Sequence, residues 1–257
     1  MFNLNDGLLN WLTKEVITIT EDWQAALIIG ISGVLVMIVS YLLGSVNSAI
    51  IISKAMFGDD IRTHGSGNAG LTNMLRTYGK GAAGLTLLGD MLKAVFSILF
   101  AGIIFGFGYY NGISISDFCY VAGLFAVIGH IFPIYYGFRG GKGVLSTATV
   151  ALMLTPVPFL ILITLFIIIV AMSKYVSLGS VSVAVLFPVV VSGYIKVFFS
   201  GYSAPLIMTL CTILLAIIIV WCHRENLKRI SDRTERKISF KKKDVEVQKK
   251  AEDNENE

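Results

Sequence analysis

The topology of the chain depends on residues 144–174, which have the sequence VLSTATVALMLTPVPFLILITLFIIIVAMSK. This stretch is apolar nearly throughout and exceeds the roughly 20 residues that one helical bilayer crossing requires. It also contains TPVP at Thr155–Pro158. Two prolines this close disfavour a continuous helix, because proline lacks a backbone N–H and clashes with the preceding turn. Two arrangements stay open: one crossing of about 28 residues, or two short helices that fold back on each other.

The rest of the chain has the composition of a membrane protein. Of its 257 residues, 55% are hydrophobic and 15% are charged, whereas soluble domains carry roughly 25% charged residues. Apolar runs near or above about 18 residues recur along the sequence and predict an all-α, polytopic integral membrane protein. We expect further membrane spans at residues 25–56, 81–107, 118–136, 176–199 and 205–221.

The distribution of Lys and Arg chooses between the two arrangements, since these residues concentrate on the cytoplasmic side of a membrane. They lie in the loops 57–80 and 137–143, and residues 223–257 contain eleven more. Two short helices within residues 144–174 place all three segments on one side. We therefore predict seven transmembrane helices, with the N-terminus out and the C-terminus in. Two of the seven have about 14 residues and span only roughly 21 Å each. The basic loop residues are Arg62, Arg76, Lys80, Arg139 and Lys142.

The sequence divides into three parts. Residues 1–24 are expected to form an N-terminal surface extension, residues 25–222 the seven-helix membrane domain, and residues 223–257 a cytoplasmic motif and charged tail. The first part has one basic residue, Lys14, and lacks the pattern of a signal peptide. The three cysteines have no CxxC spacing, which indicates neither a disulfide framework nor a metal site. We expect a monomer in the lipid bilayer with no metal, no cofactor and no nucleic-acid partner.

With this topology the unusual polar residues fall on one membrane face. The loop DIRTHGSGNAGLTNMLR, residues 60–76, is rich in Gly, Asn, Ser and Thr. Its glycines let backbone N–H groups converge on an anion, and Arg62 and Arg76 can bind a phosphate through paired N–H groups. Asn68 and Asn73 can fix hydroxyl groups of a ligand. A flexible cytoplasmic loop would explain the arginines but not GSGN followed by TN, so we favour a phosphate site.

A second candidate is GFRGGKGV, residues 137–144. It lacks the GxxxxGK[ST] spacing of a Walker A loop. Its residues Gly140, Gly141 and Lys142 nevertheless precede a helix N-terminus, where backbone donors and the helix dipole suit an anion. A plain loop at the start of a helix explains this stretch equally well.

Polar residues inside the spans form a third group. Asp90 and Lys93 are three residues apart on one helix face and can pair, and ionisable groups within a span usually face a site or cavity. A buried structural ion pair is the alternative. His130 lies near the inner end of its span, and Ser45 and Ser180 add hydroxyl groups on the same side.

The segment HRENLKR follows the last span. Here Asn226, Arg229 and Glu235 accompany His223, although a histidine at a helix end is more often structural than catalytic. The sequence contains no HxxxxD, GxSxG or HExxH motif, so it predicts no hydroxyl activated by a histidine in those ways. The later lysines of the tail, at positions 241–243 and 249–250, indicate a solvated tail or a contact with anionic lipid.

Five stretches together resemble the bacterial acyl-phosphate:glycerol-3-phosphate acyltransferases, the PlsY family. The similar segments span about residues 41–240 and occur in the family's order. They are GSVNSAIIISK at 44–54, DIRTHGSGNAGLTNMLRTYGKGAAGLTLLGDMLK at 60–93, GHIFPIYYGFRGGKGV at 129–144, SLGSV at 177–181, and HRENLKRI with TERK at 223–237.

This resemblance implies a reaction between acyl phosphate and sn-glycerol 3-phosphate that gives lysophosphatidic acid and phosphate. It also implies a multi-pass protein of the bacterial inner membrane, with its site facing the cytoplasm, that acts in phospholipid biosynthesis. The implied catalytic residues are Arg62, Ser66, His223, Asn226 and Glu235. The expected substrate-binding residues are Ser45, Asn68, Asn73, Arg76, Lys93, His130, Gly140, Gly141, Lys142 and Ser180.

Two other functions stay open. A transporter or flippase for a phosphorylated solute would need a polar path to the outer face, whereas the polar residues here lie on the inner half. An inactive paralogue that binds a lipid phosphate or a partner would keep the site and lack turnover.

Overall fold

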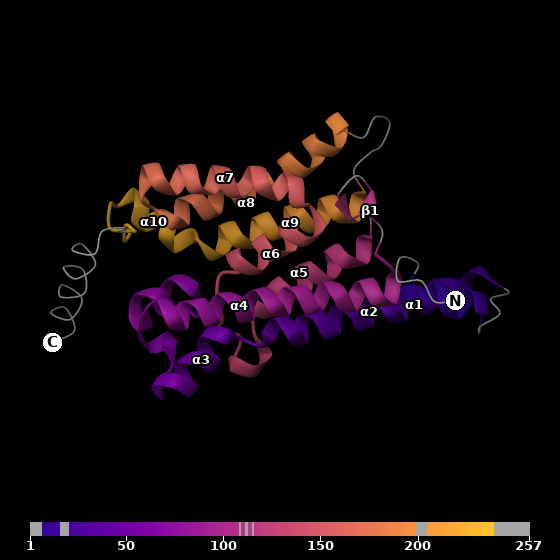
Figure 1. The fold of residues 1–257 in the computed structure, drawn as a ribbon, viewed down its shortest axis with the longest axis horizontal. Helices are drawn as coiled ribbons and strands as arrows, with labels where there is room; N and C mark the ends of the chain where they lie inside the picture. The colour runs from indigo at the N-terminus through magenta and orange to yellow at the C-terminus, as the bar shows by residue number, and fades with distance from the viewer. Residues whose placement is uncertain are drawn as a thin grey trace.

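The computed structural model describes residues 7–15, 21–107, 109–110, 113–114, 116–198 and 205–238 (Figure 1). This part of the chain is helical apart from loops and one short antiparallel pairing, β1 (Tyr109–Tyr110) with β2 (Ile113–Ser114). The α-helices are α1 (Gly7–Glu15), α2 (Asp22–Ser45), α3 (Ser48–Phe57), α4 (Leu71–Phe105), α5 (Asp117–Ile131), α6 (Val144–Leu154), α7 (Pro156–Ser173), α8 (Val176–Phe198), α9 (Leu206–Cys222) and α10 (Arg224–Ser231). Two 3₁₀ turns, η1 (Ile61–Thr63) and η2 (Ile134–Tyr136), lie in the loops.

The predicted span at 25–56 is confirmed as one apolar segment, Asp22–Phe57, but its helix is not continuous and breaks between α2 and α3. The side chain of Asn47 accepts a hydrogen bond from the backbone N–H of Ile50 at 3.1 Å and so caps α3. The carbonyl of Val46 accepts a hydrogen bond from Lys93 Nζ at 3.1 Å. Lys93 lies on another helix, α4, so the apolar pattern of residues 25–56 does not reveal this break.

The second span starts earlier than predicted. α4 begins at Leu71 rather than at residue 81, so Asn73 and Arg76 lie in its first turns instead of in a loop. The helix is interrupted at Gly79, whose φ of 84° is readily adopted only by glycine. The remaining loop, residues 58–70, rests on a small apolar cluster. The buried members of that cluster are Ala49, Ile50, Ile61, Ala69, Met74 and Ala82.

The predicted break within TPVP is confirmed. α6 ends at Leu154 and α7 begins at Pro156, a first helical position where the missing N–H of proline removes no helical hydrogen bond. The two helices are unequal, with 11 and 18 residues. The backbone N–H of Ile238 donates to the carbonyl of Lys174 at 2.8 Å. The end of α7 therefore lies beside the segment that follows α10.

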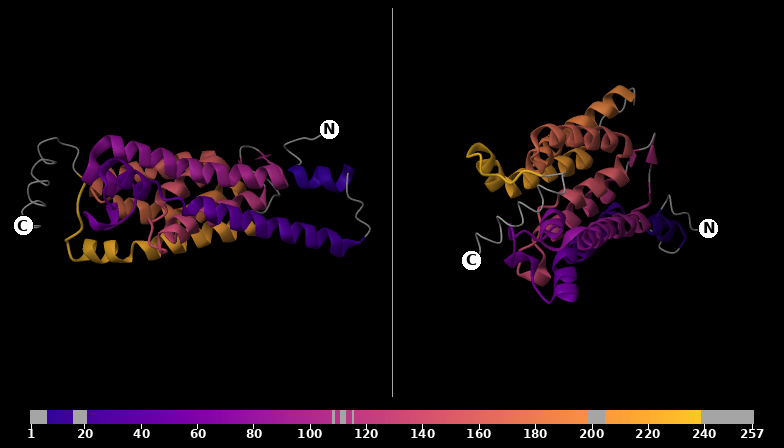
Figure 2. Two further views of the ribbon diagram at one scale, coloured as in Figure 1. Left: turned by 90° about the horizontal axis from the view of Figure 1, so that it is seen from below. Right: turned by 60° about the vertical axis from the view of Figure 1, so that its left-hand side comes forward.

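Most of the candidate polar segments gather at one end of the helical bundle. Figure 1 and the left view of Figure 2 place α3, the first turns of α4 and α10 at this end, and α1 at the opposite end. α1 packs against α4, and α10 packs against α8 and α9. The core between the ends is built mostly from small and aliphatic side chains, including Val36, Ala94, Ile98, Val150 and Leu154.

Many apolar side chains lie on the outside of the bundle, as expected for helices that face lipid. Five segments are long and apolar enough to cross a membrane: Asp22–Phe57, Leu71–Phe105, Asp117–Tyr136, Pro156–Ser173 and Val176–Phe198. α9 and α10, bent by 53°, give a sixth if they count as one span, and α6 is a shorter apolar helix. The count of seven and the orientation stay predictions. The tail lysines at 241–250 lie outside the described residues.

Candidate functional site

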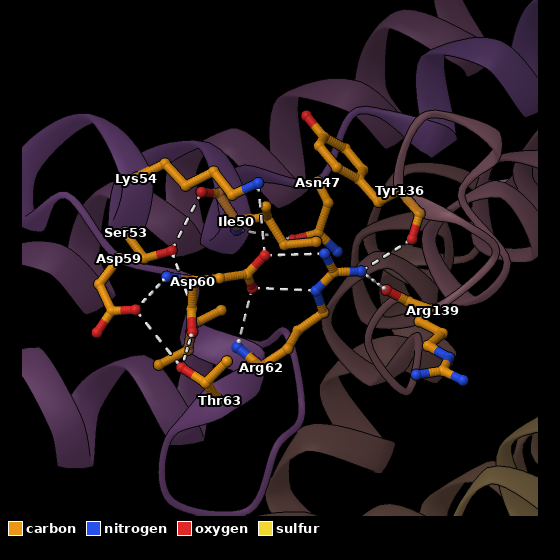
Figure 3. Close-up of polar contacts among 11 residues, drawn as sticks. Asn47, Ile50, Ser53, Lys54, Asp59, Asp60, Arg62, Thr63, Tyr136 and Arg139 are labelled. Atoms are coloured by element: carbon orange, nitrogen blue, oxygen red, sulfur yellow. Dashed lines mark hydrogen bonds and ion pairs between the residues drawn. The ribbon is translucent and has the colours of Figure 1, made fainter.

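Arg62 fastens the loop 58–70 to the glycine-rich loop 137–143 (Figure 3). Its Nε donates to Asp60 Oδ1 at 3.0 Å and one terminal nitrogen donates to Asp60 Oδ2 at 2.8 Å. The other terminal nitrogen donates to the carbonyls of Tyr136 at 2.8 Å and Arg139 at 3.3 Å. We call Asp60, Arg62 and these two carbonyls the Arg62 clamp. Four N–H bonds of one guanidinium thus serve contacts within the protein.

The side chain of Asn73 forms hydrogen bonds with backbone groups along the loop 58–70 and holds them together. Its Nδ2 lies within hydrogen-bond distance of the carbonyls of Ile61, His64 and Asn68 at 3.2, 3.0 and 3.1 Å, and its Oδ1 accepts from the backbone N–H of Ser66 at 3.2 Å. A Cβ atom at the neighbouring glycine, position 65, would lie 2.3 Å from Asn73 Oδ1, so the loop requires glycine there. The predicted residues of this stretch therefore meet, with the Ser66 side chain exposed and Asn73 buried.

The glycine-rich loop lies directly on α5. The N–H of Gly140 donates to the carbonyl of Ile131, and the N–H of Gly141 donates to the carbonyl of His130, both at 3.1 Å. A Cβ atom at Gly141 would lie 2.1 Å from His130 Nε2. These glycines permit close approach to α5, and their N–H groups bond to protein carbonyls instead of pointing at a ligand.

Lys142 leads from this loop to a polar group that we call the C-terminal cluster: Lys142, Ser177, Asn226, Arg229 and Glu235. Lys142 Nζ donates to Asn226 Oδ1. Asn226 Nδ2 in turn donates to Ser177 Oγ at 3.0 Å and to Glu235 Oε1 at 2.7 Å. Ser177 Oγ also donates to Glu235 Oε1, and Arg229 Nε donates to Glu235 Oε2 at 2.8 Å. The cluster joins the glycine-rich loop, α8, α10 and the segment beyond α10.

The charges of the two groups differ. Hydrogen bonds from Arg62 lower the pKa of Asp60 to about 2, which keeps the clamp an ion pair. Burial raises the pKa of Glu235, but hydrogen bonds from Ser177, Asn226 and Arg229 outweigh it and hold the pKa below its ordinary value. Burial lowers the pKa of Lys142 while Glu235 opposes that change. Arg229 contacts two carboxylates, Glu235 at 2.8 Å and Glu225 at 4.0 Å, whereas Lys142 donates to the neutral amide oxygen of Asn226.

A third polar group lies inside the bundle, behind the glycine-rich loop. Lys93 Nζ is 2.9 Å from Asp90 Oδ1 and 2.7 Å from His130 Nδ1. The side chains of Lys93 and His130 are 5% exposed and that of Asp90 is 2% exposed. The predicted pairing of Asp90 with Lys93 is confirmed, and His130 from α5 joins it.

Other predicted residues lie outside these groups. Ser45 Oγ donates to the carbonyl of Tyr41 at 2.8 Å and accepts from the N–H of Ile134 at 3.4 Å. Ser180 Oγ donates to the carbonyl of Val176 at 2.9 Å within α8, one turn from the cluster. His223 is buried at the junction of α9 and α10, and Arg76 is half-buried in α4. Their roles in binding or catalysis stay predictions.

Four side chains of the three polar groups were missing from the predicted set of site residues: Asp60, Asp90, Ser177 and Arg229. Asp60 is the carboxylate that orients Arg62, and Ser177 rather than Ser180 contacts Asn226 and Glu235. The i, i+2 spacing of Asp60 and Arg62 is visible in the sequence. The spacing of Ser177 and Glu235, 58 residues apart, gives no comparable signal.

Comparison with known proteins agrees with this arrangement. A family model described as "Glycerol-3-phosphate acyltransferase" matches residues 34–233, which include all three polar groups except Glu235. A relative of that name from Clostridioides difficile (strain 630) is 40% identical over 214 residues, covering 82% of this chain and 98% of the relative. Another, from Bacillus subtilis (strain 168), is 34% identical over 206 residues, covering 80% and 97%.

A solved structure has the same fold. The crystal structure of PlsY, an integral membrane glycerol 3-phosphate acyltransferase, in its glycerol 3-phosphate form aligns with a TM-score of 0.69 at 31% identity, covering 81% of this chain and 96% of PlsY. Its lysophosphatidic acid form aligns with a TM-score of 0.67 at 29% identity. The chain therefore belongs to the glycerol-3-phosphate acyltransferase family, the integral membrane PlsY family.

Proposed function

We propose that the chain transfers an acyl group from acyl phosphate to sn-glycerol 3-phosphate, giving lysophosphatidic acid and inorganic phosphate. The observation that supports this most strongly is the C-terminal cluster. It brings Lys142, Asn226 and Glu235, from two segments similar to the family's motifs, into one hydrogen-bonded group in which the ammonium of Lys142 donates to a neutral amide oxygen. A phosphorylated substrate requires such a group, and a structural loop does not.

In the proposed site, Lys142 holds a substrate phosphate. Within the described residues its hydrogen-bond partner is Asn226, and an ammonium has further N–H groups for a ligand. Glu235 fixes Asn226 and Arg229 through hydrogen bonds at 2.7 and 2.8 Å. The carboxylate therefore orients the cluster, and its lowered pKa keeps it ionised at neutral pH.

In this proposal the neutral ring of His223 has its proton on Nδ1. Its Nδ1 lies 2.8 Å from the carbonyl of Ile219, and a carbonyl only accepts, so Nδ1 bears the proton. Nε2 is then an acceptor that can receive a hydrogen bond from a hydroxyl group of the substrate. We place His223 in the site in this role.

The reaction needs no covalent enzyme intermediate, because an acyl phosphate is already activated. A hydroxyl oxygen of glycerol 3-phosphate attacks the acyl carbon, and the bond from that carbon to the phosphate oxygen breaks. The phosphate leaves with the bonding electrons, and a phosphate oxygen takes the hydroxyl proton. The protein contributes alignment of the two substrates and neutralisation of their charges. The acyl chain lies between helices, in lipid.

We also propose seven crossings with the N-terminus out, the C-terminus in and the site facing the cytoplasm of a bacterial cell. The fold-back at Thr155 supports this, since it brings Lys174 beside the segment after α10. A green fluorescent protein fused to the C-terminus should fluoresce, and alkaline phosphatase at the same position should be inactive. The reverse pattern would overturn the orientation.

The reaction is tested with the purified full chain, palmitoyl phosphate and radiolabelled glycerol 3-phosphate. We expect one lysophosphatidic acid and one phosphate per acyl group consumed. Product from palmitoyl-CoA but not from palmitoyl phosphate would overturn the proposed donor. No product with any acyl length, from either donor, would overturn the acyltransferase. Uptake of glycerol 3-phosphate by proteoliposomes without donor would then favour a transporter, and binding without turnover an inactive paralogue.

A further inference from the structure

We infer that Asp90, Lys93 and His130 form a buried positioning unit that holds the glycine-rich loop, and with it Lys142, in place. These residues act through the loop rather than by touching substrate. The inference rests on the proposed function for its kinetic consequence, and on geometry alone for its structural one.

The ammonium of Lys93 contacts three different segments, through an ion pair with Asp90 and hydrogen bonds with His130 and the carbonyl of Val46. Asp90 Oδ1 lies on α4 at 2.9 Å, His130 Nδ1 on α5 at 2.7 Å, and the carbonyl of Val46 between α2 and α3 at 3.1 Å. One buried cation therefore connects α4 to α5 and to the break between α2 and α3.

The ammonium also fixes the proton on the histidine ring. An ammonium only donates, so His130 Nδ1 must accept and the proton of the neutral ring lies on Nε2. Nε2 is the atom that faces the glycine-rich loop, because a Cβ atom at Gly141 would lie 2.1 Å from it and 2.8 Å from the carbonyl of Ala69. Gly141 therefore packs closely against both the His130 ring and the backbone of the first loop at Ala69.

The same histidine binds the loop through its backbone. The carbonyl of His130 accepts from the N–H of Gly141, and the next carbonyl, of Ile131, accepts from the N–H of Gly140, both at 3.1 Å. Lys142 follows immediately and donates to Asn226. A shift of the His130 ring would thus move the residue that we propose binds the substrate phosphate.

Stability alone does not account for this unit. Replacing a buried ion pair by neutral side chains of similar volume is often neutral or stabilising, whereas removing one partner leaves an uncompensated charge. The unit is electrically balanced, with one ammonium, one carboxylate and a neutral ring. Its specific effect is to set one arrangement of α4, α5 and the loop.

The test uses Asp90→Asn/Lys93→Met, which removes both charges together, and His130→Asn, which leaves the charge pair intact. Ser97→Ala is the matched control, because the one hydrogen bond that this buried hydroxyl makes within the described residues is to the backbone carbonyl of Lys93, at 2.8 Å. We expect amide hydrogen exchange in residues 137–144 to become roughly tenfold faster in both test variants, with exchange in α7 and α8 unchanged. Ser97→Ala should leave exchange in the loop at the wild-type rate.

The kinetic consequence is a KM for glycerol 3-phosphate that rises roughly tenfold, with a smaller change in kcat. Loss of turnover in proportion to loss of folded protein, with KM unchanged, would indicate a merely structural role and overturn the inference. Unchanged loop exchange in whichever of the two variants folds would overturn it as well. The exchange experiment needs no substrate, so a wild-type protein without acyltransferase activity would refute the proposed function and leave this test in force.

Discussion

The Arg62 clamp and the C-terminal cluster hold opposite sides of the same glycine-rich loop, yet they use their cations differently. Arg62 donates four hydrogen bonds, two to the carboxylate of Asp60 and two to backbone carbonyls, and Asp60 also pairs with Lys54 at 3.5 Å. In the C-terminal cluster Arg229 contacts Glu235 and, at 4.0 Å, Glu225, whereas Lys142 donates to the neutral amide oxygen of Asn226. We infer from this difference that a motif arginine can position a loop while a neighbouring lysine keeps N–H groups for the proposed substrate.

Of the substitutions that test this comparison, Lys142→Met should cause the largest loss of activity. We expect kcat/KM for glycerol 3-phosphate to fall by roughly 10²–10³-fold, because a charged donor to the substrate phosphate is lost. The matched control is Lys228→Met, an exposed lysine on α10, which should retain wild-type activity. Equal activity of the two variants would show that Lys142 does not bind substrate.

Glu235→Gln should have the next largest effect, a loss of roughly tenfold to a hundredfold in kcat/KM. The amide keeps the shape of the side chain but removes the nearer of the two carboxylates that Arg229 contacts. Full activity of Glu235→Gln would mean that the cluster functions without the charge of this residue.

The same residue predicts a dependence of stability on pH. Because the folded-state pKa of Glu235 lies below its ordinary value of 4.5, its contribution is complete above that pH and is lost as the pH falls through the lowered pKa. Thermal melting of the wild type and of Glu235→Gln should therefore converge on acidification. A melting difference that widens at low pH would contradict the lowered pKa.

Arg62→Lys and Asp60→Asn test whether the Arg62 clamp positions the glycine-rich loop. A lysine cannot reproduce the forked contact with Asp60 and also reach both carbonyls. We expect each variant to lose roughly tenfold in kcat/KM, and the double variant to lose little more, since both changes break one clamp. Arg139→Lys, with an exposed side chain on the neighbouring loop, is the control. If Arg62→Lys were far more damaging than Asp60→Asn, Arg62 would bind substrate directly, as its place in the family motif suggests.

Ser177→Ala should have the smallest effect, a loss of a few-fold in kcat/KM, because it removes one neutral hydroxyl from a network that keeps its charged bonds. Thr164→Val is the control, since this exposed hydroxyl bonds only within α7. A loss in kcat/KM as large as that of Glu235→Gln would show that the Ser177 hydroxyl contributes as much to the cluster as the Glu235 carboxylate.

The parts of the fold that depend on local chemistry could be predicted from the sequence. The prolines of TPVP mark the break between α6 and α7, and the spacing of Asp90 and Lys93 marks their pairing. The break between α2 and α3 could not be predicted, because Lys93 on a distant helix satisfies the carbonyl of Val46. The start of α4 at Leu71 also differs from the predicted loop 60–76, because the glycines and polar residues there are typical of a loop and Gly79 interrupts the helix.

The site shows the same limit. The motifs identified Lys142, Asn226 and Glu235, but their contacts join residues up to 84 positions apart. The partners of Arg62 are backbone carbonyls 74 and 77 residues away, for which side-chain types give no signal. Sequence patterns thus locate the charged residues, while the distinction between positioning and binding needs the three-dimensional contacts.

The central claim is that the loop 58–70, the glycine-rich loop 137–143 and residues 223–238 enclose one glycerol 3-phosphate site. Amide hydrogen exchange of the wild-type protein with and without glycerol 3-phosphate tests it most directly. We predict that the ligand slows exchange in all three segments together, over the same concentration range, and that Lys142→Met abolishes the slowing in all three. Slowing confined to one segment, or slowing that persists in Lys142→Met, would contradict a single shared site.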